Sequence, residues 1–284
     1  MGNSTKILLL CNNSGTEYLS RIHKSVSRVG GPAGFRTEIE NTFHTGRPIA
    51  DVLADEAIAG VILTPPYSDD RHVLLMLEER RIPYVRISPL LDPDRGCCVM
   101  MDEYDAARAV TDLLLSKGHR RIGIMKGPNV HLVSMRRYNG YANALGGKGL
   151  RVDPSLVAQG DFSRESGRAE AGKLFAAKPT AIFASNDEMA AGIIDAAKAA
   201  NIDIPGTISL VGYDDNAIAS IVRPRLTTVR QPLEKMGESA CRLLIDRIRL
   251  PGRGSETAVI PYEIVERESV VEFKAEGGLS RLAG

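Results

Sequence analysis

The sequence has little of the chemistry that builds metal sites and disulfides. Its 284 residues include only four cysteines, Cys11, Cys97, Cys98 and Cys241, which form no C-x-x-C pair and have no histidine at zinc-finger spacing. The adjacent Cys97 and Cys98 have a spacing that disulfides rarely use. We therefore expect reduced thiols in a cytoplasmic protein, with no metal ion and no cofactor.

Long apolar runs and an excess of one charge are also absent. No stretch of about 18 apolar residues occurs, and the first ten residues lack the apolar run of a signal peptide. We expect neither a membrane span nor export. Lys and Arg number 36 and Asp and Glu 35, which leaves a net charge of +1. Such a balance gives no strong field toward nucleic acid or anionic lipid.

Signatures of common catalytic sites are missing as well. Residues 167–173 have the spacing of a phosphate-binding loop, but Leu174 stands where a hydroxyl should bind magnesium. The glycine-rich residues 30–34 follow a predicted helix rather than a strand, which favours a turn. The five histidines form no H-E-x-x-H, and no serine lies in a G-x-S-x-G elbow. We expect no enzymatic activity. The alternative is a hydrolase on this fold, which turnover of a sugar derivative would support.

What the sequence does have is a regular alternation of short apolar runs and helix-length amphipathic segments, and enough length for two domains. The apolar runs predict strands at 7–11, 60–63, 84–87, 121–125, 180–184, 208–212 and 263–267. The amphipathic segments predict helices near 17–29, 47–58, 69–80, 104–117, 134–146, 164–176, 187–200 and 232–249. This rhythm is typical of an α/β protein with two doubly wound parallel sheets. Ligands bind such sheets at the carboxyl ends of the strands, where polar residues gather in this sequence.

Several ordered motifs resemble one family across nearly the whole chain. They lie in residues 102–128 (ending SKGHRRIGIMKGP), 137–145 (RYNGYANAL), 179–187 (PTAIFASND), 211–215 (VGYDD) and 224–232 (PRLTTVRQP). With these motifs the sequence resembles the effector-binding core of the lac-repressor/galactose-repressor (LacI/GalR) family of bacterial transcription regulators. Any one motif alone would be weak, and the ordered set is specific.

The resemblance implies two subdomains of the type I periplasmic-binding-protein-like fold, joined by three crossovers. It places residues 1–118 and 231–260 in the N-terminal subdomain, and residues 119–230 and 261–284 in the C-terminal one. A small metabolite is expected in the cleft between them. The first predicted strand begins at Ile7, so we expect the DNA-binding headpiece of the family to be absent from this chain.

Two charged residues match the effector-contacting positions of the family. Arg137 corresponds to an arginine whose fork of donors suits hydroxyl or carboxylate oxygens. Asp214 follows a predicted strand and matches a pocket aspartate that accepts hydrogen bonds from hydroxyls or a ring nitrogen. Without the resemblance, Arg137 would be an ordinary exposed helical arginine. A turn or capping role fits the neighbouring Asp215 better than Asp214.

The remaining candidates come from the same loops, and each has a plainer structural explanation. One of Asn186 and Asp187 should cap the following helix; we expect Asn186 rather to touch ligand and Asp187 to do both. Tyr18 and Phe162 match aromatic or apolar pocket walls, although buried aromatics mostly serve packing. The weaker candidates are Asn13, Ser14, His131 and Asp102.

These features predict a metabolite sensor rather than an enzyme. We expect a monosaccharide or sugar-derived effector, because the positions of His131 and Val133 lack the polar pair that a purine base would need. The resemblance implies a homodimer that acts on operator DNA through headpieces. The alternative is a solute-binding receptor that never touches DNA; an upstream helix-turn-helix would favour the regulator and a signal peptide the receptor.

Overall fold

The computed structural model describes residues 5–13, 15–252 and 254–274. The elements of the first sheet and its surroundings are β1 (Lys6–Cys11), α1 (Thr16–Gly30), β2 (Arg36–Asn41), α2 (Thr42–Thr45), α3 (Ile49–Val52), β3 (Ile58–Leu63), the 3-10 helix η1 (Tyr67–Asp69), α4 (Arg71–Glu79), β4 (Tyr84–Ile87), β5 (Cys97–Met100), α10 (Leu233–Arg249) and β11 (Thr257–Val259). The remaining elements are α5 (Glu103–Ser116), β6 (Ile122–Lys126), α6 (Leu132–Gly147), η2 (Pro154–Leu156), β7 (Val157–Gln159), α7 (Arg164–Ala176), β8 (Ala181–Ala184), α8 (Asp187–Ala199), β9 (Ser209–Asp214), α9 (Ala217–Ile221), β10 (Thr227–Arg230) and β12 (Glu263–Val265).

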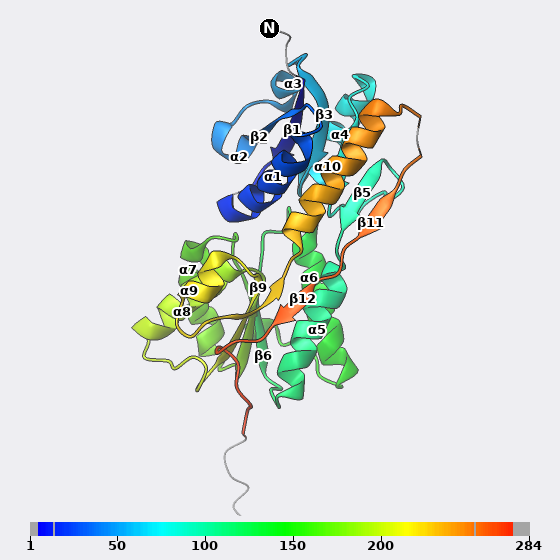
Figure 1. Cartoon of the computed structure of the whole chain (residues 1–284). Coiled ribbons are helices and arrows are strands. Elements are labelled where there is room, and N and C mark those ends of the chain that lie inside the picture. Colours follow the sequence, from blue (N-terminus) through cyan, green and yellow to red (C-terminus); the bar gives the residue numbers. More distant parts are fainter. Residues whose placement is uncertain (1–4, 14, 253, 275–284) are drawn as a thin grey trace, which may run out of the picture. The chain divides into compact units, whose positions relative to one another are not determined.

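The strands form two six-stranded sheets (Figure 1). Their orders are β11-β5-β4-β3-β1-β2 and β12-β10-β9-β8-β6-β7. Strands β1 to β5 are joined in parallel, as are β6 to β7, β6 to β8 and β8 to β9. The chain passes between the sheets three times, after β5, after β10 and after β11. The predicted α/β class, with two doubly wound sheets and three crossovers, is confirmed.

The contacts between residues divide the chain into two compact units. The first unit is Met1–Ala106, Gly127–Arg137 and Val229–Glu263. The second unit is Ala107–Lys126, Tyr138–Thr228 and Ile264–Gly284. The division expected from the sequence, 1–118 with 231–260 and 119–230 with 261–284, stays a prediction.

The first unit is built around strands whose side chains are buried on both faces. All six residues of β1 are buried, as the apolar run Ile7 to Cys11 predicts for a central parallel strand. Helices α1 and α10 pack against one face of the sheet, with Ile22 and Leu244 in that core. Helix α4 packs Leu74 and Leu77 into a second core on the other face.

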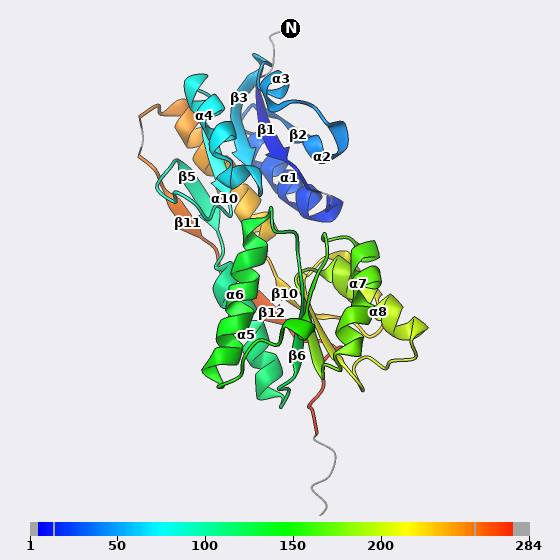
Figure 2. The ribbon, with the colours of Figure 1, turned by 180° about the vertical axis from the view of Figure 1, so that it is seen from behind.

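The second unit repeats this arrangement. Helices α7 and α8 pack closely together on one side of its sheet, and Figure 2 shows α5 and α6 on the other side of β6. Helix α7 begins at the predicted residue 164 because the Ser163 side chain accepts a hydrogen bond from the Ser166 backbone N–H. None of the helices in the described part of the chain combines the length and apolar character needed to cross a membrane.

Two expectations about elements need correction. The helix expected over 47–58 is only α3, Ile49–Val52, because the Asp55 carboxylate accepts a hydrogen bond from the Ala57 N–H, forming a turn that leads into β3. Strand β2 and the shorter strands β5, β7, β10 and β11 were not expected. Strand β2 is RTEIEN, a charged edge strand with one side unpaired, so it lacks the apolar run of a central strand.

Candidate functional site

Arg137 lies in a buried ion pair within the first unit. Its side chain on α6 is 5% exposed, and its Nε donates to Oε2 of Glu103 at 2.8 Å. Glu103 is the first residue of α5 and is 3% exposed. The alternative of an ordinary exposed helical arginine is therefore excluded, and a buried arginine needs a charged partner of this kind. Glu103 was not among the site residues expected from the sequence.

Next to this pair lie a buried histidine and a buried serine. His131 is 8% exposed, and its pKa is lowered to about 4, first by burial and then by the positive charge of Arg137. Ser134 is 1% exposed, and its hydroxyl has no hydrogen-bond partner among the described residues. Residues 134 and 137 are three apart on α6, so they share one face of that helix. Thr64, directly after β3, carries a second fully buried hydroxyl without such a partner.

The lowered pKa of His131 predicts acid sensitivity of the fold. The unfolded histidine titrates near 6.5, so between pH 6.5 and about 4 the unfolded chain binds a proton that the folded chain does not. Stability should therefore fall as the pH drops through this window. Urea titrations at pH 7 and pH 4.5 should show that His131→Asn reduces this loss by up to about 2 kcal/mol. The exposed His72→Asn is the control, and an equal pH response in wild type and His131→Asn would contradict the assignment.

Two buried carboxylates lie at the carboxyl end of the second sheet. Asp214 is the last residue of β9, is 7% exposed and has a φ of +111°. Asp187 is fully buried; its oxygens accept hydrogen bonds from Thr228 Oγ1 at 2.7 Å and the Asn216 N–H at 2.8 Å. Burial, followed by the charge of Asp214, raises the pKa of Asp187 well above its usual range. Both Asp187 oxygens thus have protein partners, and ligand contact by either aspartate stays a prediction.

Asn186 holds the start of α8 and the loop beside it. Its Oδ1 accepts from the Met189 N–H and its Nδ2 donates to the Phe162 carbonyl, both at 2.9 Å. Asn186 is therefore the N-cap, and the expectation that Asp187 would cap the helix is wrong, because Asp187 is already the first residue of α8. Phe162 has a φ of +71° and packs against the core of the second unit, while Tyr18 packs against the core of the first.

The weaker candidates have local structural partners. The Asn13 N–H donates to the side-chain Oδ1 of Asn41, and the Asn41 Nδ2 donates back to the Asn13 carbonyl. The Asn13 side-chain Oδ1 accepts a hydrogen bond from the Gly15 N–H at 2.7 Å. Asp102 is exposed and accepts from the Asp105 N–H, which caps the start of α5. Ser14 lies outside the described residues. Ligand contacts by these residues stay predictions.

One polar cluster at the ends of β1 and β2 was not expected from the sequence. Asn12 Nδ2 donates to Thr42 Oγ1 at 3.0 Å, and the Thr42 hydroxyl lies 2.6 Å from the Tyr67 hydroxyl. These three residues are up to 55 positions apart, so only the strand order β3-β1-β2 brings them together.

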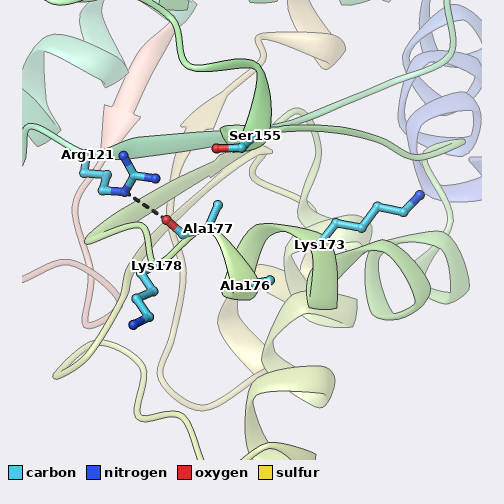
Figure 3. Close-up of a pocket in the computed structure, with 6 residues that line it drawn as sticks. All are labelled: Arg121, Ser155, Lys173, Ala176, Ala177 and Lys178. Carbon is cyan, nitrogen blue, oxygen red and sulfur yellow. Dashed lines mark hydrogen bonds between the residues drawn. The ribbon is translucent and has the colours of Figure 1, made fainter.

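A separate hollow of about 600 Å³ lies in the second unit (Figure 3). Its lining residues are Arg121, Ser155, Lys173, Ala176, Ala177 and Lys178. Arg121 precedes β6 and donates to the Ala177 carbonyl at 2.8 Å, so this hollow is near the amino end of the strand. It contains none of the predicted site residues. In residues 5–13, 15–252 and 254–274, no three His, Cys, Asp or Glu side chains gather to hold a metal ion.

The relatives found by comparison with known proteins are transcriptional regulators. The family description "Periplasmic binding protein-like domain" matches residues 111–270. The HTH-type transcriptional regulator CelR of Thermobifida fusca is 34% identical over 76% of this chain, which spans 65% of that protein. The HTH-type transcriptional regulator DegA of Bacillus subtilis (strain 168) is 31% identical over 93% of this chain, which spans 80% of that protein.

A solved structure of a transcriptional regulator is also similar to this chain. The CelR–cellobiose complex has a TM-score of 0.84 and 28% identity, over 94% of this chain and 86% of that one. The matched family region exceeds half of the chain, and the similarity to DegA covers 93% of this chain and 80% of DegA. The chain therefore belongs to the LacI/GalR family of transcriptional regulators and carries the periplasmic-binding-protein-like effector-binding core of that family.

Proposed function

We propose that the chain is the effector-sensing core of a sugar-responsive transcriptional regulator. The observation that carries the proposal is the buried Arg137–Glu103 pair, because a desolvated arginine at the family's effector position is held ready for a small polar ligand. The similar CelR structure, a complex with cellobiose, supports a sugar as the ligand class. In the second unit, Asp214 is the proposed acceptor of sugar hydroxyl hydrogen bonds.

The proposed mechanism is a shift between two conformations. An effector favours a conformation only by its difference in affinity for the two, which in allosteric proteins is typically about 1–3 kcal/mol. A homodimer would pass this shift to operator DNA through headpieces, as the family resemblance implies. The named relatives are regulators, which favours this role over a solute receptor or a hydrolase.

Substitution of the two charged residues tests the proposal. A thermal-shift panel of D-glucose, D-ribose, cellobiose, ribose 5-phosphate and adenine first identifies the binding sugar, because a ligand at about 100 times its Kd adds about 2.7 kcal/mol of stability. Arg137→Lys keeps a cation beside Glu103 and loses the guanidinium fork, and Asp214→Asn keeps the shape and loses the charge. Calorimetry should show at least about tenfold weaker binding for each.

The exposed neighbour Arg136→Ala is the matched control and should bind as the wild type does. Circular dichroism should confirm that all three variants are folded. Unchanged affinity in both Arg137→Lys and Asp214→Asn would refute the site, and a panel in which no sugar binds would refute the function.

A further inference from the structure

The charge of Arg137 is already balanced inside the protein. Arg137 and Glu103 are 5% and 3% exposed and 2.8 Å apart, so each is the other's partner away from water. Together they form a neutral pair. An arginine that awaited an anionic ligand would gain nothing from a buried carboxylate at its Nε, because two anions would then compete for one buried cation.

The nearest titratable neighbour on α6's N-terminal side is uncharged. His131 remains neutral at physiological pH because its pKa is lowered to about 4. Besides Glu103, the first turn of α5 carries the carboxylate of Asp105, which accepts a hydrogen bond from Tyr262 at 2.6 Å, and the exposed Asp102 directly precedes the helix. Arg137 thus faces a buried carboxylate and a neutral imidazole, and a further carboxylate lies in the first turn of α5.

The same neighbourhood suits hydroxyl groups. A guanidinium carries five N–H donors, more than one carboxylate can accept, and a carboxylate has several lone pairs for O–H donors. The Ser134 hydroxyl, one turn before Arg137 on the same face of α6, is buried and has no hydrogen-bond partner among the described residues. A buried hydroxyl without a partner indicates a missing ligand or water, and it can both donate to and accept from a sugar hydroxyl.

We infer that Glu103 determines effector specificity, making the Arg137 site select neutral polyhydroxylated molecules and reject their carboxylate or phosphate counterparts. This inference rests on the proposed function, in which Arg137 contacts the effector. Neutral hydroxyls hydrogen-bond to the ion pair without disturbing it. An anion must either displace Glu103 or share the buried site with it, and both outcomes weaken binding.

The test compares matched neutral and anionic ligands by calorimetry at pH 7. The pairs are D-glucose with D-gluconate, D-ribose with D-ribonate, and cellobiose with cellobionate. For a neutral sugar that binds, wild-type protein should bind the matched acid at least tenfold more weakly. Glu103→Gln keeps the side-chain shape and an amide oxygen for Arg137, so it should reduce that ratio at least tenfold by strengthening acid binding.

Asp112→Asn is the control, because it removes one carboxylate from the same helix at a 39% exposed position. Its neutral-to-acid ratio should equal that of the wild type. An unchanged ratio in folded Glu103→Gln, or a wild-type preference for the acid, would overturn the inference while leaving the proposed function intact. The wild-type ratio keeps the test decisive even where Glu103→Gln unfolds. If neither sugars nor acids bind to wild-type protein, the proposed function fails, and the inference fails with it.

Discussion

Replacement of Arg86 by methionine should destabilise the first unit by about 3–5 kcal/mol, because it leaves a buried acid and several carbonyls without their donor. Arg86 on β4 is fully buried and makes an ion pair with Asp69 at 3.2 Å. Its guanidinium also donates to the backbone carbonyls of Ser68, Leu91, Asp92 and Arg95. One side chain thereby fixes the loop between β4 and β5.

Urea denaturation followed by far-ultraviolet circular dichroism measures this effect. The control is Arg80→Met, an exposed position directly after α4, which should change the free energy of unfolding by less than about 0.5 kcal/mol. Similar transitions for Arg86→Met and Arg80→Met would show that the buried network contributes little to stability.

Gly192→Ala should destabilise the second unit by about 3 kcal/mol, because α7 and α8 approach too closely for a side chain at this position. A Cβ on Gly192 would lie 2.1 Å from the carbonyl oxygen of Arg164 and 2.6 Å from the backbone nitrogen of Arg168. Both neighbours are backbone atoms, so the two helices would have to separate.

Gly172→Ala provides a control of opposite sign in the same helix pair. Gly172 is exposed on α7, and a Cβ there meets nothing within 4 Å, so alanine should stabilise the protein by up to about 1 kcal/mol through its higher helix propensity. Urea titrations of both variants should therefore move the midpoint in opposite directions. A small or stabilising effect of Gly192→Ala would contradict the close packing of α7 and α8.

The central strands could be predicted from the sequence because strands that are buried on both faces consist mostly of apolar residues. Strand β1 is apolar from Ile7 to Cys11 because both of its faces are covered, and the same holds for all of β8 and for the middle of β9. Strands β2 and β11 could not be predicted in this way. They lie at the edges of the first sheet, and half-exposed, three- to six-residue segments carry no apolar run.

The candidate site was only partly predictable, because pairing depends on how helices pack. Arg137 and Asp214 came from motifs that resemble the family, and both are buried, Arg137 within α6 and Asp214 at the end of β9. Glu103 lies 34 positions from Arg137, and no local pattern links them. Asn186 and Asp187 are adjacent at a helix start, and only the structure assigns the cap to Asn186 and the bonds from Thr228 and Asn216 to Asp187.

A crystal structure of the chain with the sugar that binds most tightly in the thermal-shift panel would show whether Arg137 and Asp214 hold the effector. We expect sugar hydroxyls within hydrogen-bond distance of the Arg137 guanidinium and of the Asp214 carboxylate, with the Glu103 carboxylate still paired to Arg137. A sugar bound elsewhere, or an Arg137 side chain that leaves Glu103 and turns into solvent, would contradict it.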